Sequence, residues 1–241
     1  MKAKLAVCAV LAVASYTAAE TTPDAKAILH RADQARGIGD MYQVQTKITN
    51  HKGSDSEVHL FQVLVKGADK SLVHFLDPRD KGRSLLMLQD DMWIFLPNTD
   101  RPVRITPLQR LVGNASNGDV ARTNYENDYA SSLLRTEEVD GHTCYVLELL
   151  AVRKGATYQK IHYWVGAEDG LPHKADFFLA SGKCYKTATF DRYQQVGGSQ
   201  VLAKMTIRDL TGSDEWTTME YSGYAAGNYP DKLFNKTQMG K

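Results

Sequence analysis

The sequence has almost no excess of charge of either sign. Its 241 residues include 29 lysines and arginines against 28 acidic residues, which leaves a net charge of +1 at pH 7. This balance provides no electrostatic attraction to nucleic acid or to an anionic membrane surface. Beyond the N-terminus, no apolar run reaches the roughly 18 residues of a membrane-spanning helix. No Pro- or Ser-rich linker interrupts the chain, so a single domain is expected.

The usual signatures of catalytic and metal sites are also missing. The sequence contains no His-Glu-x-x-His motif, no cysteine pair at zinc-ligand spacing, no Gly-x-Ser-x-Gly elbow and no phosphate-binding glycine-rich loop. Of the histidines, His59, His74 and His162 fall within strand-like runs, where ordinary wall positions are expected. We therefore expect no enzymatic activity, no metal and no cofactor.

Cysteine is scarce. After the N-terminal segment only Cys144 and Cys184 remain, and they begin two strand-like runs that lie three segments apart. In an up-and-down meander such strands are about 14 Å apart, whereas a disulfide joins Cα atoms roughly 6 Å apart. We expect two separate, buried thiols, and a disulfide would require a topology other than a meander.

The N-terminus is typical of a secretory signal peptide. Lys2 and Lys4 precede an apolar run at residues 5–14, and small residues follow it up to Ala19. This run is too short to span a bilayer, which needs about 20 apolar residues. We expect residues 1–19 to be a cleaved signal peptide and residues 20–241 to form one periplasmic domain in a Gram-negative bacterium.

Most of the remaining chain has the pattern of β-strands, after a short amphipathic helix that ends near Gly37. Residues 42–49 alternate between apolar and polar side chains, which indicates a half-buried strand. Other runs are apolar on both faces, so a helix, a second sheet or a ligand must cover each face. These runs lie at residues 58–65, 72–76, 85–88 and 92–96. Further runs, separated by glycine-containing hairpin turns, lie at residues 142–151, 156–165, 171–180, 183–195, 199–210 and 214–224.

Residues 107–130, between the two groups of strands, are expected to form a helical excursion, because Pro107 follows Thr106 as at a capped helix start. About twelve antiparallel strands must curl or close, since open twisted sheets rarely exceed about ten strands. Their interior would hold a helix, a ligand or both. The predicted fold is mainly β (α+β): one curved antiparallel sheet with short helices covering its concave face.

Several segments resemble the periplasmic LolA/LolB-like superfamily, in its branch of outer-membrane lipoprotein-sorting proteins. In the first half they lie at residues 81–82, 92–97 (MWIFLP) and 101–105 (RPVRI). In the second half they lie at residues 141–148 (GHTCYVLE), 163–165 (YWV), 170–172 (GLP) and 186–190 (KTATF). Their order and spacing extend over about residues 40–235. The resemblance implies an unclosed half-barrel whose apolar concavity receives the acyl chains of lipids or lipoproteins between two membranes.

The strand runs and the expected helices contain the candidates for such a cavity. The aromatic candidates for its lining are Phe75, Trp93, Phe95 and Trp164. Leu108 and Leu111 are the apolar candidates on a helical lid. The basic residue that latches the lid in lipoprotein carriers has no assignable counterpart, and Arg104 is a candidate because it lies near the predicted lid. An error of one residue in register would exchange the two faces of every strand.

Three functions remain open. A lipid or lipoprotein carrier predicts an apolar cavity and lipid that copurifies with the protein. A non-catalytic interaction module, such as an accessory to an envelope transporter, would fill the concavity with its own side chains and bind an envelope protein at a sheet edge. An enzyme ranks third, because scattered groups such as His74 and Asp77 would have to converge. The expected partners are an acyl chain or an envelope membrane protein, and not nucleic acid.

Overall fold

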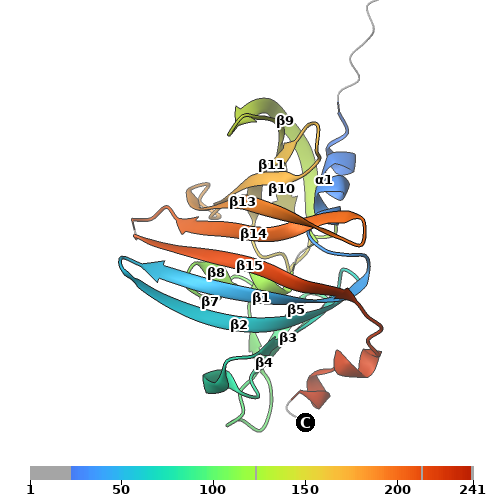
Figure 1. The fold of residues 1–241 in the computed structure, drawn as a ribbon, viewed down its shortest axis with the longest axis vertical. Coiled ribbons are helices and arrows are strands. Elements are labelled where there is room, and N and C mark those ends of the chain that lie inside the picture. The colour runs from blue at the N-terminus through green and yellow to red at the C-terminus, as the bar shows by residue number, and fades with distance from the viewer. Residues whose placement is uncertain (1–22, 123, 213, 240–241) are drawn as a thin grey trace, which may run out of the picture.

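A large antiparallel sheet dominates the protein (Figure 1). The structure, a computed structural model, describes residues 23–122, 124–212 and 214–239. The predicted signal peptide, residues 1–19, lies outside these described residues. Within the described residues the sheet contains thirteen strands, and two further strands form a separate hairpin. The predicted fold class is confirmed, because the fold is one curved antiparallel sheet with few helices that does not close into a barrel.

Neighbouring strands of the sheet are joined as a meander. In chain order its strands are β1 (Met41–Lys52), β2 (Asp55–Lys66), β3 (Lys70–Phe75), β4 (Ser84–Leu88), β5 (Asp91–Phe95), β6 (Val103–Ile105), β9 (Tyr129–Val139), β10 (His142–Ala151), β11 (Lys160–Gly166), β12 (Pro172–Phe178), β13 (Cys184–Val196), β14 (Ser199–Asp209) and β15 (Glu215–Ala226). Every strand-like run predicted from the sequence overlaps one of them, although the predicted run at 156–165 begins four residues before β11. Strands β6 and β9 were not predicted.

The pairing of β1 with β15 joins the two halves of the sheet. It runs from Lys52↔Glu215 to Tyr42↔Ala226, and places β1 between β2 and β15. The resulting order is β6-β5-β4-β3-β2-β1-β15-β14-β13-β12-β11-β10-β9. The edges are therefore β6 and β9, and these two strands do not pair with each other.

Helices are few and short. The predicted N-terminal helix is confirmed, and Asp24 caps it by accepting a hydrogen bond from the Lys26 amide at 3.0 Å. Figure 1 shows this helix beside β9 and β11, which it contacts through its buried face. No helix among the described residues is long and apolar enough to cross a membrane. The helices and 3₁₀ turns are α1 (Ala25–Gln34), α2 (Asn117–Ala121), η1 (Pro78–Asp80), η2 (Asp231–Leu233) and η3 (Lys236–Gln238).

The helical excursion predicted for residues 107–130 is wrong in most of its length. The chain forms a turn, then a hairpin of β7 (Arg110–Val112) and β8 (Ala115–Ser116), and only then the single turn of α2. Hydrogen bonds to a distant strand decide this outcome. Asn114 donates from its backbone amide to Thr217 Oγ1 at 2.7 Å and from Nδ2 to the Glu215 carbonyl at 2.9 Å. These tertiary contacts to β15 outweigh the local preference for a helix.

Different parts of the chain cover the two faces of the sheet. We call the face that packs against α1 and α2 the inner face; its apolar cluster includes Val73 and Met92. On the opposite, outer face, Phe234 and Met239 of the C-terminal segment pack over Leu86. The strands around β4 are therefore buried on both sides, as their two-sided apolar runs predicted.

The two cysteines of the described chain are unpaired, as predicted. Cys144 lies at the start of β10 and Cys184 at the start of β13, with β11 and β12 between these strands. Cys144 is buried, whereas Cys184 is only half-buried. The meander geometry therefore keeps the thiols apart.

The close packing of the β7–β8 turn against β1 and β15 leads to a stability prediction. Gly113 joins these strands with a φ of +52°, and a Cβ atom there would overlap Asn50 Oδ1 and Thr217 Oγ1. We expect Gly113→Ala to lower the free energy of unfolding by about 2–5 kcal/mol, from backbone strain and steric overlap together. Urea unfolding followed by circular dichroism measures this change.

The matched control is Gly182→Ala, in the turn between β12 and β13. Gly182 has a φ of +84°, but no atom lies within 4 Å of its Cβ position. This control carries only the backbone cost of about 1–2 kcal/mol. Equal losses of unfolding free energy in the two variants would contradict the close packing of the β7–β8 turn.

Candidate functional site

Protein side chains occupy the centre of the inner face. Asp119 of α2 lies there, and Lys186 Nζ of β13 approaches its Oδ2 to 2.7 Å. Tyr158 Oη donates to Asp119 Oδ1 at 2.7 Å, and Ser116 completes a capping box with the same carboxylate. All four of these residues are buried. The centre of the half-barrel is therefore a packed polar anchor for α2 and not an open apolar cavity.

The partners of Asp119 determine its ionisation. Burial alone would raise the pKa of this carboxyl group, but the ammonium group of Lys186 and the hydrogen bonds from Ser116 and Tyr158 stabilise the carboxylate. The net result is a pKa below the ordinary value. Asp119 is thus a buried anion with a buried cation beside it.

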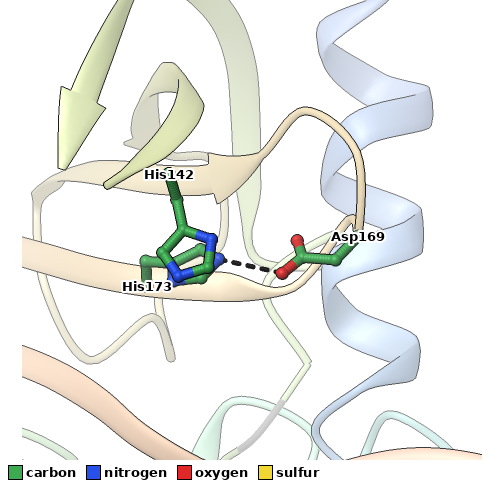
Figure 2. Close-up of side chains that lie close together, drawn as sticks. All are labelled: His142, Asp169 and His173. Carbon is green, nitrogen blue, oxygen red and sulfur yellow. Dashed lines mark hydrogen bonds and ion pairs between the residues drawn. The ribbon is translucent and has the colours of Figure 1, made fainter. Parts of the chain in front are cut away.

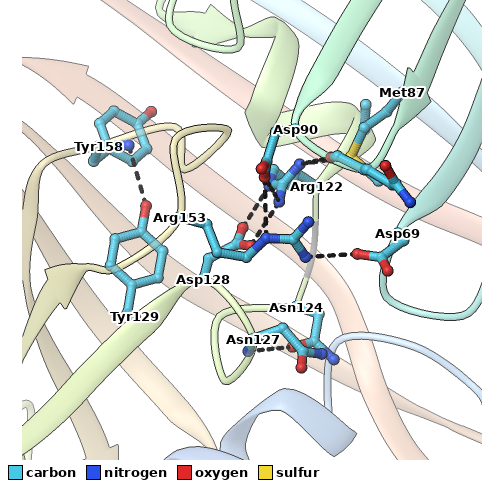
Figure 3. Close-up of polar contacts among 12 residues, drawn as sticks. Asp69, Met87, Asp90, Arg122, Asn124, Asn127, Asp128, Tyr129, Arg153 and Tyr158 are labelled. Atoms are coloured by element: carbon cyan, nitrogen blue, oxygen red, sulfur yellow. Dashed lines mark hydrogen bonds and ion pairs between the residues drawn. The ribbon is translucent and has the colours of Figure 1, made fainter.

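A second buried ion pair fixes the segment between α2 and β9 (Figure 3). Arg122 Nη2 donates to Asp128 Oδ1 at 2.6 Å, and Nη1 donates to the Gln89 carbonyl at 2.7 Å. Nearby, Arg153 donates from Nη1 to Asp69 Oδ1 at 2.6 Å and from Nε to Asp90 Oδ1 at 3.0 Å. Because Arg153 follows β10 while Asp69 and Asp90 belong to turns of the β2–β5 half, these contacts hold the two halves of the open sheet together across the interior.

A cavity of about 740 Å³ lies beside α1, and both charged and apolar side chains form its walls. We call it the α1 cavity. Arg36 lines it and is almost fully buried over the ring of Tyr125, at 4.1 Å from the ring centroid. The Nε and Nη1 atoms of Arg36 have no hydrogen-bond partner in the described part of the chain. The charged residues in the walls of the α1 cavity include Arg31, Asp33, Asp40, Glu126 and Asp169.

Asp33 is one of the carboxyl groups in this wall. Its Oδ2 accepts a hydrogen bond from the Glu126 amide at 2.6 Å, while its Oδ1 is buried without a partner among the described residues. Burial raises the pKa of Asp33 to about 7, because the charge of Arg36 and the backbone donors compensate only in part.

Two further cavities, whose exposed walls are more apolar than polar, both have Phe75 and Arg83 in their walls, at the end of the sheet near η1. The inner Phe75 cavity has a volume of about 250 Å³ and the outer Phe75 cavity about 490 Å³. The guanidinium carbon of Arg83 lies 5.4 Å from the centroid of the Phe75 ring, between the two spaces. Apolar walls of the inner cavity include Ile94, Ile105, Leu111 and Val112, and those of the outer cavity include Leu72, Phe95, Pro97, Leu233 and Met239.

The Phe75 cavities bring together three of the side chains proposed from the sequence. Phe75 lines both spaces, Leu111 lines the inner one and Phe95 lines the outer one. Leu111 belongs to strand β7 and not to a helical lid.

The other proposed residues lie elsewhere. Trp93 is on the outer face, packed with Phe234 and Met239, and Trp164 is in a separate outer cluster with Cys144. Both tryptophans alternate with inner-face neighbours, so they lie on the outer face and not in the concavity, as does Phe95. Leu108 is half exposed in the turn before β7, and the lid helix predicted around it does not form. Arg104 lies on β6 and forms an ion pair with Asp91.

Sequence reasoning missed Arg83 and the C-terminal segment. Arg83 stands two positions after the recognised Lys81, but no pattern indicated that its side chain would lie over Phe75. Leu233 and Met239 follow the last strand and reach the outer cavity only because the chain crosses the outer face of the sheet. No local signal identifies such a long-range contact.

Comparisons with known proteins agree with this fold. The chain is 34% identical to a LolA superfamily protein, NE2245, from Nitrosomonas europaea; the match covers 90% of this chain and 99% of the other, with a TM-score of 0.85. This chain belongs to the LolA superfamily. A family model described as "Uncharacterized protein" also matches residues 67–241. No curated protein matches the sequence.

Two more distant structures share the LolA fold. A DUF1329 family protein from Desulfovibrio piger is 22% identical, with a TM-score of 0.77 over 89% of this chain and 97% of its own. A putative outer membrane lipoprotein-sorting protein domain from Vibrio parahaemolyticus is 22% identical, with a TM-score of 0.76 over 90% of this chain and 100% of its own. The family resemblance found in the sequence is thereby confirmed.

The buried pair in the centre predicts a large stability loss on mutation. We expect Lys186→Met to lower the free energy of unfolding by about 3–5 kcal/mol at pH 7, because it leaves the Asp119 carboxylate buried without its cation. In the variant, burial without the Lys186 ammonium group raises the pKa of Asp119, so the deficit relative to the wild type should shrink as the pH falls towards 4 and the variant's carboxylate is protonated. Urea unfolding at several pH values measures both effects. Lys174→Met, which removes a half-buried partner of Asp176, should cost about 1 kcal/mol or less.

The raised pKa of Asp33 predicts that its contribution to stability changes with pH in the direction opposite to that of Asp119, whose pKa is lowered. A carboxyl group whose pKa is higher in the folded protein binds its proton more tightly when folded, so the protein loses stability as the pH rises from about 4 towards 7. We expect Asp33→Asn to raise stability relative to the wild type by about 1 kcal/mol or more at pH 8, and to have little effect at pH 4. Thermal unfolding at the two pH values tests this. A constant difference would contradict the raised pKa.

Proposed function

We propose that this LolA superfamily protein is a non-catalytic periplasmic carrier that binds an acyl chain of a lipid or lipoprotein in the two Phe75 cavities. Membership of the superfamily supports a carrier-like role, and the predicted signal peptide supports the periplasm. The single observation that carries the proposal is that Phe75 lines two mainly apolar cavities while the centre of the inner face is filled. This supports a binding site at the end of the half-barrel and not in its middle.

The size and lining of the cavities suit an acyl chain. Their volumes of about 250 and 490 Å³ together lie within the range of small-molecule sites, roughly 300–1,000 Å³. Each acyl CH₂ group removed from water contributes about 0.8 kcal/mol, so a sixteen-carbon chain gains on the order of 10 kcal/mol before ordering costs. This gain is large enough to hold a lipid.

Arg83 offers a polar contact beside the apolar walls. Its Nη1 forms an ion pair with Asp80 at 2.8 Å, while its Nε is buried and has no hydrogen-bond partner among the described residues. A carboxyl, ester or phosphate oxygen at the end of an acyl chain would satisfy this donor. The proposed cargo thus has its chain against Phe75 and its polar end near Arg83.

A second candidate, the non-catalytic envelope interaction module, is favoured by the filled centre of the inner face and by the open edge of β9. This edge strand runs over eleven residues and pairs only with β10 in the described sheet. An unpaired strand of that length can accept an added strand from a partner protein. The module requires no lipid.

The first experiment is a native mass spectrum of the protein exported with its own signal peptide and purified without detergent. We expect added mass that organic extraction removes as phospholipid or acylated peptide. A protein that carries no lipid, and takes up none when lipid vesicles are offered, would favour the interaction module instead.

Variants test where an acyl chain binds. Leu111→Asp and Phe95→Asp place a charge in the inner and outer Phe75 cavities, and each should weaken binding of a fluorescent fatty-acid probe by at least about tenfold. Leu108→Asp is the matched control, because Leu108 is close in sequence to Leu111 but half exposed and outside both cavities. Circular dichroism checks that each variant is folded. Unchanged probe binding in both cavity variants would refute this site.

A further inference from the structure

We propose a binding site for a divalent metal ion of the zinc class, formed by His142, Asp169 and His173. These residues come from three segments: His142 begins β10, Asp169 lies in the turn after β11, and His173 lies near the start of β12. The site is at the surface, outside both the buried centre of the sheet and the Phe75 cavities. It is independent of the carrier function proposed above.

The geometry of the three side chains fits one small ion. One ligand atom from each residue lies within 4.8 Å of the others. His173 Nε2 is 3.1 Å from Asp169 Oδ2, close to the roughly 3.4 Å between two ligand atoms that are each 2.1 Å from a tetrahedral ion. The centroids of the two imidazole rings are 4.2 Å apart, and Figure 2 shows both rings beside the carboxylate of Asp169.

The donor set favours zinc among the available ions. Two imidazole nitrogens and one carboxylate oxygen suit Zn²⁺, Ni²⁺ or Cu²⁺ better than Mg²⁺ or Ca²⁺, which prefer oxygen ligands. Zn²⁺ accepts three protein ligands with water at the remaining position. His142 and Asp169 are exposed, so an ion can reach the site and keep such a water ligand.

The local backbone positions the carboxylate for this role. Asp169 Oδ1 accepts a hydrogen bond from the Leu171 amide at 2.9 Å, which leaves Oδ2 directed at His173. A Cβ atom on Gly166 would overlap Asp169 Oδ1 and lie 2.9 Å from His173 Nε2. Only glycine at position 166 therefore lets the carboxylate and imidazole approach each other in this turn. Outer contacts of this kind orient ligands in metal sites.

A second cluster, of one histidine and two aspartates, is less well arranged for a metal ion. His59 lies near Asp77 and Asp80, with nitrogen–oxygen distances of 3.6 and 3.9 Å. The same Oδ2 atom of Asp77 that faces His59 accepts a hydrogen bond from the Leu60 amide, and Asp80 pairs with Arg83 at 2.8 Å. In the first cluster, by contrast, no lysine or arginine of the described chain forms an ion pair with Asp169.

Metal binding would also affect α1. The turn that carries Asp169 holds this helix through a hydrogen bond from Arg31 Nη2 to the Glu168 carbonyl at 3.0 Å. The Arg31 side chain lies against Gly170, and both residues line the α1 cavity. An ion that ties this turn to β10 therefore stiffens one wall of the α1 cavity.

The test uses the chain without an affinity tag, after treatment with a chelator. Competition with a chromophoric zinc chelator should give one Zn²⁺ per chain, and Co²⁺ should give a visible absorption band from nitrogen and oxygen ligands. His142→Ala, His173→Ala and Asp169→Asn should each weaken Zn²⁺ binding by at least about tenfold. Zn²⁺ should raise the Tm of the wild type, and a chelator should reverse this rise.

The matched control is His51→Ala. His51 stacks on Trp216 with ring centroids 4.8 Å apart and shares no contact with the cluster. Its Zn²⁺ affinity should equal that of the wild type. Circular dichroism establishes that each variant is folded, and Asp169→Asn keeps the shape of the side chain if either alanine variant is unstable. No stoichiometric binding by the wild type, or an affinity that survives all three ligand variants, would overturn the proposal.

Discussion

The hydrogen-bonded ladder between β1 and β15 is the interaction on which the rest of the structure depends. It joins two meanders, β1–β6 and β9–β15, into one sheet of thirteen strands. A sheet of that size must curve because every pair of strands is twisted. The curvature creates an inner side, and the chain from β6 to β9 has to cross that side to connect the two edges. The hairpin β7–β8 and helix α2 are this crossing, and they fill the space that the curved sheet encloses.

The filled interior decides where a ligand can bind. A half-barrel whose centre held only apolar walls could take an acyl chain there, as the family resemblance implied. Here the centre holds the Asp119–Lys186 pair and its hydrogen-bond partners, which would lose their contacts if a chain displaced α2. Leaving a buried charge without its partner costs several kcal/mol, which opposes such a displacement. Apolar space remains where the crossing segment and the C-terminal segment approach the end of the sheet, around Phe75.

Another part of the molecule is organised around α1, whose cavity has several charged side chains in its walls. Arg36 and Asp33 bring charge into its cavity, and Arg31 fastens the helix to the β11–β12 turn. The same turn contains Asp169 of the proposed metal site, so ion binding and the position of α1 share one short segment of backbone. The apolar cavities and the histidine cluster thus lie on different parts of the sheet and can be tested separately.

The sequence was enough to predict eleven strands of the large sheet and their hairpin turns, because alternation, two-sided apolar runs and glycine turns are local signals. The meander that these turns imply was in turn enough to predict that Cys144 and Cys184 are unpaired. The sequence also determined the superfamily, through segments spaced along most of the chain. It could not determine which face of β5 and β11 is the inner one, since the period of two is the same for either choice. That is why Trp93 and Trp164 were assigned to the cavity. The tertiary structure alone decided the hairpin at residues 110–116, through hydrogen bonds to β15 about a hundred positions away. It alone brought His142 beside Asp169 and His173, and Arg83 over Phe75, because contacts between distant segments depend on strand pairing that no local pattern encodes.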